Sequence, residues 1–539
     1  MRLSLPKTTS RTKVSDVDEA QQKFWSNWRW WSAPALAALI LAYIFRDPFI
    51  GDWDGLDYTV LALQGQPSTM ALGRSLFIFT NNALYLLAHA AFGLQPENAY
   101  LLFKYAVIAS GALAVIACWV LARDLTGCVR TATVAALLVT CSPTFVIYSG
   151  QVMTDVPSVL LITLALIIHL GGVRRQSLWM MLLGAALLGL GANVRETVLF
   201  YGPWLVFAPF VCGWKSERRT FLMIALCCLA FIVCAFGWFL YWYVLDAFSY
   251  RAAWAGWRET MKAEAARHPV TLRNLIPFIL FFFITGPMVL IALPAAFFKE
   301  WRTRRLSPLL LMAAVGLWSN LLLIFNYSTT INWRYFLTGL PALVPLVADY
   351  FMRSQTLKMK GERRAFWSVV AGIALVTTLV GIYSKPTSRE VIQKRALTRD
   401  YRERLALLPR DAVVIAGGQA IAVTYWRGIG LGQWTEIGTG AGWPGNKLAP
   451  VIEEYLKNGR RVFLDADPHW WAPCGWQLDE TLELVKLESR FSFRHVSDHI
   501  YELRPQGDAT ARDHPSLQRL LPENRPADVQ KCAGVSKLS

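Results

Sequence analysis

The sequence predicts an α-helical polytopic membrane protein with about eleven transmembrane helices, followed by a small extracytoplasmic α/β domain. Of its 539 residues, 54% are hydrophobic and only 17% are charged, and the mean hydropathy is +0.34. This composition excludes a soluble multidomain protein. The apolar runs are long enough for helices that cross about 30 Å of hydrocarbon, at roughly 20 residues each. They lack the even alternation of polar and apolar residues that barrel strands show.

Eleven apolar runs are predicted to cross the membrane. They are residues 30–48, 98–121, 131–149, 157–172, 178–194, 198–213, 221–244, 275–297, 307–326, 336–351 and 366–383. The charged segment "RDPFIGDWD" follows the first run, where a signal peptide would have a small-residue cleavage site, so we expect this run to be retained as a span. Residues 1–29 then form a cytoplasmic N-terminal segment, and residues 30–384 form the transmembrane domain.

Basic residues in every second loop predict the orientation of the chain. These loops contain Arg123 and Arg130; Arg174 and Arg175; Lys215, Arg218 and Arg219; Lys299, Arg302, Arg304 and Arg305; and Arg353, Lys358, Lys360, Arg363 and Arg364. The positive-inside rule places them in the cytoplasm. The large first loop, 49–97, and everything after residue 384 therefore lie on the outer face. This rule and anionic membrane lipids also account for the net charge of +17, so we expect no nucleic-acid partner.

The parts outside the spans have their own predicted structure. Residues 57–97 are too polar to span and predict interfacial helices that lie along the membrane. Residues 385–504 contain strand-like and helix-like segments in alternation, "DAVVIAGG", "KLAPVIEEYLKNG" and "RRVFLDAD", which predict the α/β domain. Residues 505–539 are predicted to be a mobile tail. Cys474 and Cys532, the two cysteines on the outer side, either pair or remain free thiols, because their spacing fits no metal site.

Two acidic motifs fall on the predicted outer face. The segment "DWDGLDY" carries Asp52 and Asp54, and "VMTDVP" carries Asp155 at a short turn. Taken singly, Asp54 is explained as a solvated loop carboxylate, and Asp155 as an acid at a helix N-terminus. The two motifs share their membrane side with the cations of "NVRET" and "NWRYF", which contain Arg195 and Arg334. This coincidence favours a shared functional site.

The loop 245–274 adds cations to the same face. Tyr250, Trp254, Trp257 and Met261 recur at helical spacing, which predicts an interfacial helix with an aromatic stripe. Its cations Arg251, Arg258 and Lys262 have two explanations: they reach the lipid headgroups, or they bind a phosphate.

The ordered motifs resemble those of the GT-C fold, the membrane glycosyltransferases that use polyprenyl-phosphate sugars, such as protein O-mannosyltransferases and the lipid A aminoarabinose transferase. The resemblance covers about residues 30–350. It rests on "DWDGLDY" after the first span, "VMTDVP", "NVRET" and the "RYF" that opens a late span. In that family the acid after the first span is the catalytic base, and Asp54 matches best by its spacing to Tyr58. The common form is Asp-Glu, whereas this chain has Asp-Trp-Asp, so Asp52 stays an alternative base.

The resemblance implies a function, a location and a set of site residues. A sugar would move from a polyprenyl-phosphate donor to a hydroxyl of an envelope glycolipid, a glycan or a protein, on the outer face of the bacterial inner membrane. A carboxylate would take the proton of the acceptor hydroxyl, and cations would hold the departing phosphate. Asp54, Asp155 and Asp52 are the expected catalytic residues. The expected substrate-binding residues are Tyr58, Arg195, Glu196, Arg251, Arg258, Lys262, Arg334 and Tyr335.

Metal dependence and two other function classes are alternatives. The carboxylates of Asp52, Asp54, Asp155 and Glu196 are hard ligands that suit a divalent metal, as in the metal-dependent oligosaccharyltransferase relatives. No close acid-rich or His-rich spacing requires a metal, so we predict none. A transporter would also be a polytopic bundle, but transporters place ionisable groups near the midplane. A lipid-linked polysaccharide polymerase or ligase relies more on arginines in a large outer loop.

Overall fold

A computed structural model gives the fold of the chain. It describes residues 28–46, 53–68, 72, 74–267, 275–302, 306–326, 333–354, 372, 376, 379, 402–416, 420–430, 433, 435–438, 448–468, 471, 481–482, 484–506 and 517–524. Four predictions concern residues outside this part: Asp52, Cys474, Cys532 and the predicted span 366–383, of which only residues 372, 376 and 379 are described.

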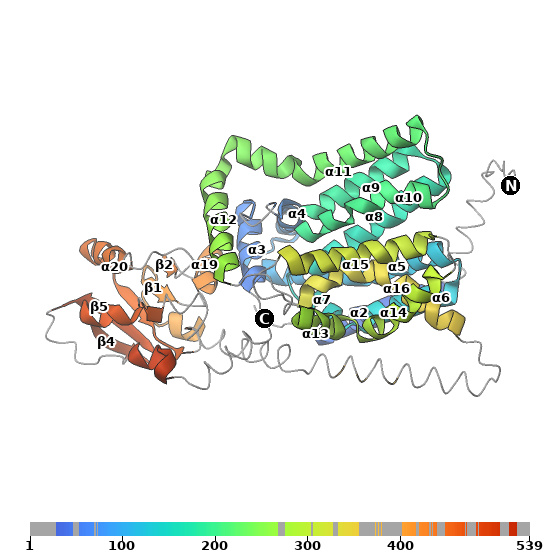
Figure 1. Ribbon diagram of the computed structural model, residues 1–539. Helices are drawn as coiled ribbons and strands as arrows, with labels where there is room; N and C mark the ends of the chain where they lie inside the picture. Colours follow the sequence, from blue (N-terminus) through green and yellow to red (C-terminus); the bar gives the residue numbers. More distant parts are fainter. Residues whose placement is uncertain are drawn as a thin grey trace, which may run out of the picture.

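The larger part of the molecule is a bundle of helices that run side by side (Figure 1). These helices are α2 (Trp28–Ile44), α5 (Ala99–Thr126), α6 (Val129–Thr140), α7 (Pro143–Ser149), α8 (Asp155–Arg175), α9 (Leu178–Ala192), α10 (Gly202–Val211), α11 (Arg218–Leu245), α13 (Leu275–Thr285), α14 (Pro287–Trp301), α15 (Pro308–Asn326) and α16 (Leu340–Ser354). The short 3-10 helices η2 (Glu196–Tyr201) and η5 (Trp333–Gly339) lead into α10 and α16. The fold class is therefore mainly helical, as predicted.

Some predicted spans are broken helices. Within the described residues, five helices are long and apolar enough to cross a membrane, or seven if two bent pairs are each one span. The predicted span 131–149 consists of α6 and α7, which meet at 67°. Pro143 begins α7, where its missing N–H costs nothing, and the Ser142 hydroxyl caps the helix by accepting from the N–H of Phe145 at 3.2 Å. The count of eleven spans stays a prediction.

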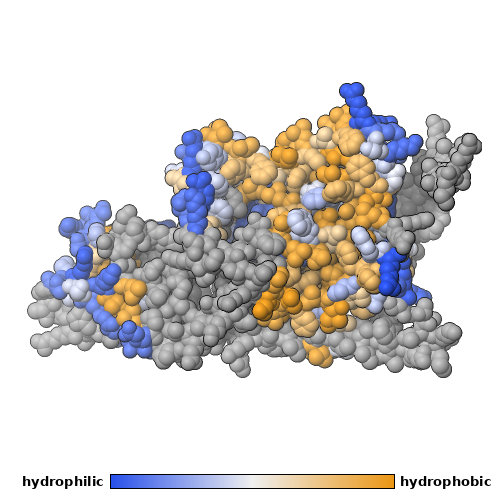
Figure 2. Space-filling view, in the orientation of Figure 1, coloured by the Kyte–Doolittle hydropathy of each residue, from blue (hydrophilic) through white to orange (hydrophobic). Residues whose placement is uncertain are grey.

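The acidic and basic loops lie at opposite ends of the bundle. Helix α8 begins at Asp155 and ends with Arg174 and Arg175, and its 21 residues make it about 30 Å long. Arg174 Nη1 donates to the carbonyl of Asp124 at 2.7 Å, which joins the ends of α8 and α5. Figure 2 shows an apolar face over α8 to α11, with hydrophilic residues gathered toward its ends. One helix length, equal to the hydrocarbon thickness, therefore separates the two sets of loops.

The acidic end of the bundle is covered by helices that run across it. Helices α3 (Trp53–Gln64) and α12 (Tyr250–Arg267) cross the bundle direction between the bundle and a small domain (Figure 1). Helix α4 (Ser75–Phe92) follows α3 and is exposed along much of its length. We predicted interfacial helices here, but α4 is also long and apolar enough to cross a membrane. Helix α3 packs on α19 (Ala420–Gly428) of the small domain.

The small domain has a five-stranded sheet in the order β2-β1-β3-β5-β4. Its elements are β1 (Val413–Ala416), α19, β2 (Thr435–Gly438), α20 (Leu448–Lys457), β3 (Val462–Asp465), β4 (Phe491–Ser497) and β5 (Ile500–Pro505). Strand β1 pairs in parallel with β2 and β3, and β5 pairs antiparallel with β3 and β4. The strand-like and helix-like segments predicted from the sequence coincide with β1, α20 and β3. Residues 517–524, which we assigned to the tail, form two short 3-10 helices and bury Leu517 and Leu520 against this domain.

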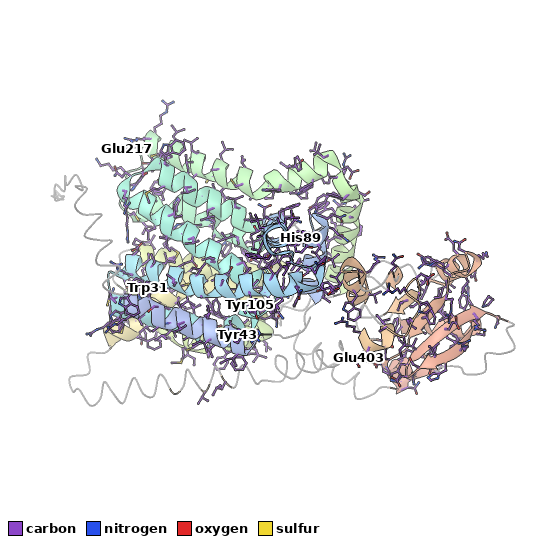
Figure 3. The ribbon with its side chains drawn as sticks, turned by 180° about the vertical axis from the view of Figure 1, so that it is seen from behind. Trp31, Tyr43, His89, Tyr105, Glu217 and Glu403 are labelled. Atoms are coloured by element: carbon purple, nitrogen blue, oxygen red, sulfur yellow. The ribbon has the colours of Figure 1, made fainter. Side chains whose placement is uncertain are left out.

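The charge distribution predicts which end of the bundle faces the cytoplasm. Glu217, in the α10–α11 connection, and Glu403, in the small domain, are both exposed and lie at opposite ends of the molecule (Figure 3). In a variant that lacks the nine native cysteines, Glu403→Cys should react with a membrane-impermeant thiol reagent on intact spheroplasts, and Glu217→Cys only after lysis. The reverse pattern would put the acidic end in the cytoplasm.

Candidate functional site at the acidic end of the bundle

Asp54 lies where α3 packs against the turn before α8. It occupies the first turn of α3, where the helix dipole favours a carboxylate. The next residue is Gly55, and a Cβ atom there would lie 3.1 Å from the carbonyl oxygen of Val152. This glycine therefore lets the "DWDGLDY" segment approach the "VMTDVP" segment closely. The two acidic motifs, about a hundred residues apart in the chain, thus meet in the fold.

The first ion pair of the site joins α3 to η5. Arg334 Nη2 donates to Asp54 Oδ2 at 2.8 Å. Both side chains are mostly buried, with 12% and 19% of their surface exposed. Arg334 also places Nη1 3.9 Å from the sulfur of Met153, in the turn before α8. The pair therefore closes the space between α3, the α7–α8 turn and η5.

The second ion pair is fully buried beside the first. Arg195 Nη1 lies 2.6 Å from Asp155 Oδ1 and donates to Thr154 Oγ1 at 3.3 Å. Removing one partner of such a pair typically costs about 3–5 kcal/mol, because the other charge stays buried. Removing either Asp155 or Arg195 is therefore expected to lower the stability of the folded state.

The ring of Tyr335 connects the two ion pairs. The guanidinium carbon of Arg195 lies 4.7 Å from the centroid of this ring, and that of Arg334 lies 5.5 Å from it. Cations over a tyrosine ring are attracted to it, by about 0.5–2 kcal/mol depending on burial. Tyr335 therefore allows two like charges to stay close together.

A third guanidinium, which the sequence analysis missed, belongs to Arg74. Its Nη2 lies 3.7 Å from Glu196 Oε1, and its guanidinium carbon lies 5.4 Å from the ring centroid of Tyr58. Arg74 is only 8% exposed. The available signal was a single arginine in the apolar segment "ALGRSLFIF" on the predicted outer face. Seven predicted residues thus share one cluster with Arg74: Asp54, Tyr58, Asp155, Arg195, Glu196, Arg334 and Tyr335.

The cluster has opposite effects on its two α3 carboxyls. Burial raises the pKa of Asp54, but the guanidiniums of Arg334, Arg74 and Arg195 outweigh this effect and hold the pKa below its usual value. Asp57 follows three residues later on α3. Burial and the charge of Asp54 raise the pKa of Asp57 to about 7, although Arg74 partly opposes the shift. Asp54 is therefore ionised at neutral pH, and Asp57 is close to its midpoint.

The predicted cations of α12 have other partners. Arg251 lies 3.9 Å from Asp246, and its Nε donates to the carbonyl of Tyr243. Arg258 and Lys262 lie 3.7 Å and 2.7 Å from Glu259. All three are exposed by half or more. The structure places them on α12, in local ion pairs, and does not bring them to Asp54.

The described carboxylates that the sequence offered as metal ligands are held apart by arginines. In the described part of the chain, no three His, Cys, Asp or Glu side chains are grouped so that they could hold a metal ion. The carboxylates of Asp54 and Asp155 are each paired with an arginine. The prediction that no metal is required therefore stays a prediction.

Comparisons with known proteins relate this fold to membrane glycosyltransferases. Residues 103–242 match the family model described as dolichyl-phosphate-mannose-protein mannosyltransferase. The search of curated protein sequences finds no match. The family model matches the region from α5 to α11, which contains Asp155 and Arg195.

Solved structures extend the likeness to nearly the whole chain. The structure is similar to ArnT from Cupriavidus metallidurans bound to undecaprenyl phosphate, with a TM-score of 0.59, 14% identity, and coverage of 90% of this chain and 100% of ArnT. It is also similar to the oligosaccharyltransferase AglB from Archaeoglobus fulgidus in complex with an inhibitory peptide and a dolichol-phosphate, with a TM-score of 0.50, 13% identity, and coverage of 94% and 78%. At this identity the likeness shows the fold. Together with the family model, it confirms the resemblance to the GT-C fold that the motifs indicated.

The raised pKa of Asp57 predicts a pH-dependent stability. An acid with a higher pKa in the folded chain favours folding at low pH, and this contribution is lost as the pH rises from about 3.8 to about 7. The Asp57→Asn variant should therefore gain thermal stability relative to the wild type as the pH rises to about 7, and the difference should then level off. Thermal unfolding in detergent at several pH values measures it. Asp411→Asn, at an exposed position of the small domain, controls for the loss of one carboxylate. A difference that does not change with pH would contradict the assignment.

Proposed function

We propose that this protein is a glycosyltransferase that moves a sugar from a polyprenyl-phosphate donor to a hydroxyl of an envelope glycolipid, a glycan or a protein. Asp54 is the catalytic base. The observation that carries the proposal is the ion pair of Asp54 with Arg334 at 2.8 Å, inside a cluster of guanidiniums at one end of an apolar bundle. A base and phosphate-binding cations lie side by side at the membrane edge.

The chemistry needs both kinds of group. A carboxylate takes the proton of the acceptor hydroxyl while the acceptor oxygen bonds to the sugar carbon. The bond between that carbon and the phosphate oxygen breaks, and the polyprenyl phosphate leaves with the electron pair. Guanidiniums that are fixed in a largely buried site stabilise the charge that develops on the leaving phosphate. Arg334 and Arg195 supply two of them, and Tyr335 keeps them at a fixed spacing.

Before the donor binds, Asp54 and Arg334 form an ion pair with each other. A carboxylate held by Arg334 is ionised but only weakly basic. A donor phosphate that binds to Arg334 competes with Asp54 for the guanidinium, and the pKa of Asp54 rises as this partner is lost. Donor binding thus converts Asp54 from half of an ion pair into a base that faces the sugar.

Asp155 has a positioning role in this account. It is fully buried and holds Arg195 at 2.6 Å, so the orientation of Arg195 over Tyr335 depends on it. Arg251, Arg258 and Lys262 remain candidates for contacts with lipid headgroups or with the donor phosphate, as the sequence suggested.

The site faces the outer side of a bacterial inner membrane in this proposal, and the small domain lies on the same side. The basic loops at the other end of α8 support this orientation by the positive-inside rule. The fold shared with ArnT bound to undecaprenyl phosphate and with AglB in complex with a dolichol-phosphate supports a polyprenyl-phosphate donor. The position of Asp54 and Arg334 at the end of the bundle, instead of its midplane, argues against a transporter.

Asp54→Asn tests the assignment of the base. The amide keeps the shape of the carboxylate but cannot accept the proton, so transfer should fall on the order of 10²–10⁴ fold while binding of polyprenyl-phosphate sugar is retained. The measurement is transfer by the purified protein, with donor binding followed separately.

Asp52→Asn is the control that decides between the two acids of "DWDGLDY". If the Asp52→Asn variant loses transfer and the Asp54→Asn variant keeps it, Asp52 is the base. Near wild-type transfer by both variants would refute a catalytic role for either carboxylate.

A further inference from the structure

An apolar groove lies between α4 and α11, beside the guanidinium cluster. It has a volume of about 460 Å³, within the range of roughly 300–1,000 Å³ found for ligand pockets. Its lining includes Leu76, Phe79 and Leu87 from α4 and Trp238 from α11, and Thr80 is its one polar residue. The eleven-residue rise from Leu76 to Leu87 gives the groove a length of about 17 Å along α4.

Aromatic side chains fix the walls of the groove. The ring of Phe79 stacks on those of Trp238 and Trp242, with centroids 5.7 Å and 5.6 Å apart. Trp242 Nε1 donates to Ser75 Oγ at 3.2 Å, which attaches the first residue of α4 to α11. The groove is therefore built by packed side chains that hold the two helices in register.

One end of the groove reaches the site. Leu76 lines the groove, and its N–H donates to the carbonyl of Asn193, two residues before Arg195, at 3.2 Å. Arg74 lies two residues before Leu76 and points toward Glu196 and Tyr58. The groove thus runs from the guanidinium cluster to the exposed part of α4, where Leu87 and Phe92 are 69% and 87% exposed.

Arg74 is held in a costly arrangement. Its backbone is left-handed, with φ of 46° and ψ of 29°, a conformation that non-glycine residues rarely adopt. Its Nε is buried, and among the described residues it has no hydrogen-bond partner. Its contact with Glu196, at 3.7 Å, is longer than a charge-assisted hydrogen bond. A strained, buried cation with an unused donor is typical of a ligand-binding residue.

We propose that Arg74 binds the phosphate of the donor lipid and that the groove between α4 and α11 holds the first part of its polyprenyl chain. This inference rests on the proposed glycosyl transfer and adds the entry route of the donor. A guanidinium cluster at the end of one apolar groove between two helices matches a lipid with one chain and an anionic head. The donor then enters sideways from the membrane along α4, and its phosphate arrives beside Arg334 and Asp54.

The test compares a long and a short isoprenyl phosphate. The full-length protein is reconstituted in nanodiscs, and binding of undecaprenyl phosphate and of dimethylallyl phosphate, which has one isoprene unit, is measured. Arg74→Gln should weaken binding of both ligands, by roughly tenfold or more, because both lose the same charge-assisted contact. Ala83→Trp fills the groove and should weaken binding of the long ligand only. Its unchanged binding of the short ligand shows that the variant is folded.

Leu86→Trp is the matched control. It adds an indole to the same helix at a position that is 53% exposed and outside the groove lining, and it should bind both ligands as the wild type does. Equal binding of undecaprenyl phosphate by the Ala83→Trp and Leu86→Trp variants would show that the groove does not hold the polyprenyl chain. Unchanged binding of both ligands by the Arg74→Gln variant would show that Arg74 does not bind the phosphate. Phosphatidic acid that displaces undecaprenyl phosphate equally well would also overturn the proposal, because the groove would then accept any lipid. A wild-type protein that binds no isoprenyl phosphate at all would instead refute the proposed function.

Discussion

The structure depends on keeping two buried ion pairs next to each other at one end of an apolar bundle. Asp54 and Arg334 form one pair, Asp155 and Arg195 form the other, and the ring of Tyr335 lies against both guanidiniums. Desolvating four charges is unfavourable unless each is paired closely. The surrounding elements meet this requirement, since the glycine after Asp54 allows α3 to reach the turn before α8. The same arrangement holds a carboxylate and two cations together at one end of the bundle.

The bundle determines where the proposed chemistry can take place. Because α8 carries Asp155 at one end and two arginines at the other, its length separates the site from the basic loops by about the thickness of the hydrocarbon layer. The small domain contacts the same end through α19 and α3, and the rings of Tyr100 and Tyr425 meet edge to face at 6.4 Å. The helix that carries Asp54 is thus fixed from both sides. In the proposed orientation, an anionic lipid headgroup at the membrane surface is at the level of the guanidiniums.

The sequence predicted the fold class and most of the cluster, because hydropathy and loop charge are local signals that need no tertiary information. It placed Asp54, Asp155, Arg195 and Arg334 on one face, and the structure brings these four together. It did not find Arg74, whose role depends on a left-handed backbone and on contacts with Tyr58 and Glu196. It left the cations of α12 with two explanations, contact with lipid headgroups or phosphate binding, since charge patterning cannot tell whether Glu259 neutralises them. The break between α6 and α7 was missed because Ser142 and Pro143 lie inside an otherwise continuous apolar run.

The most direct test of the central claim is a cryo-electron microscopy structure of the protein in nanodiscs with undecaprenyl phosphate bound. The account predicts density for the phosphate among the guanidiniums of Arg74, Arg195 and Arg334, with Arg334 turned from Asp54 toward the phosphate. It would be contradicted by a phosphate bound elsewhere on the protein while Asp54 and Arg334 remain paired as they are in the ligand-free chain.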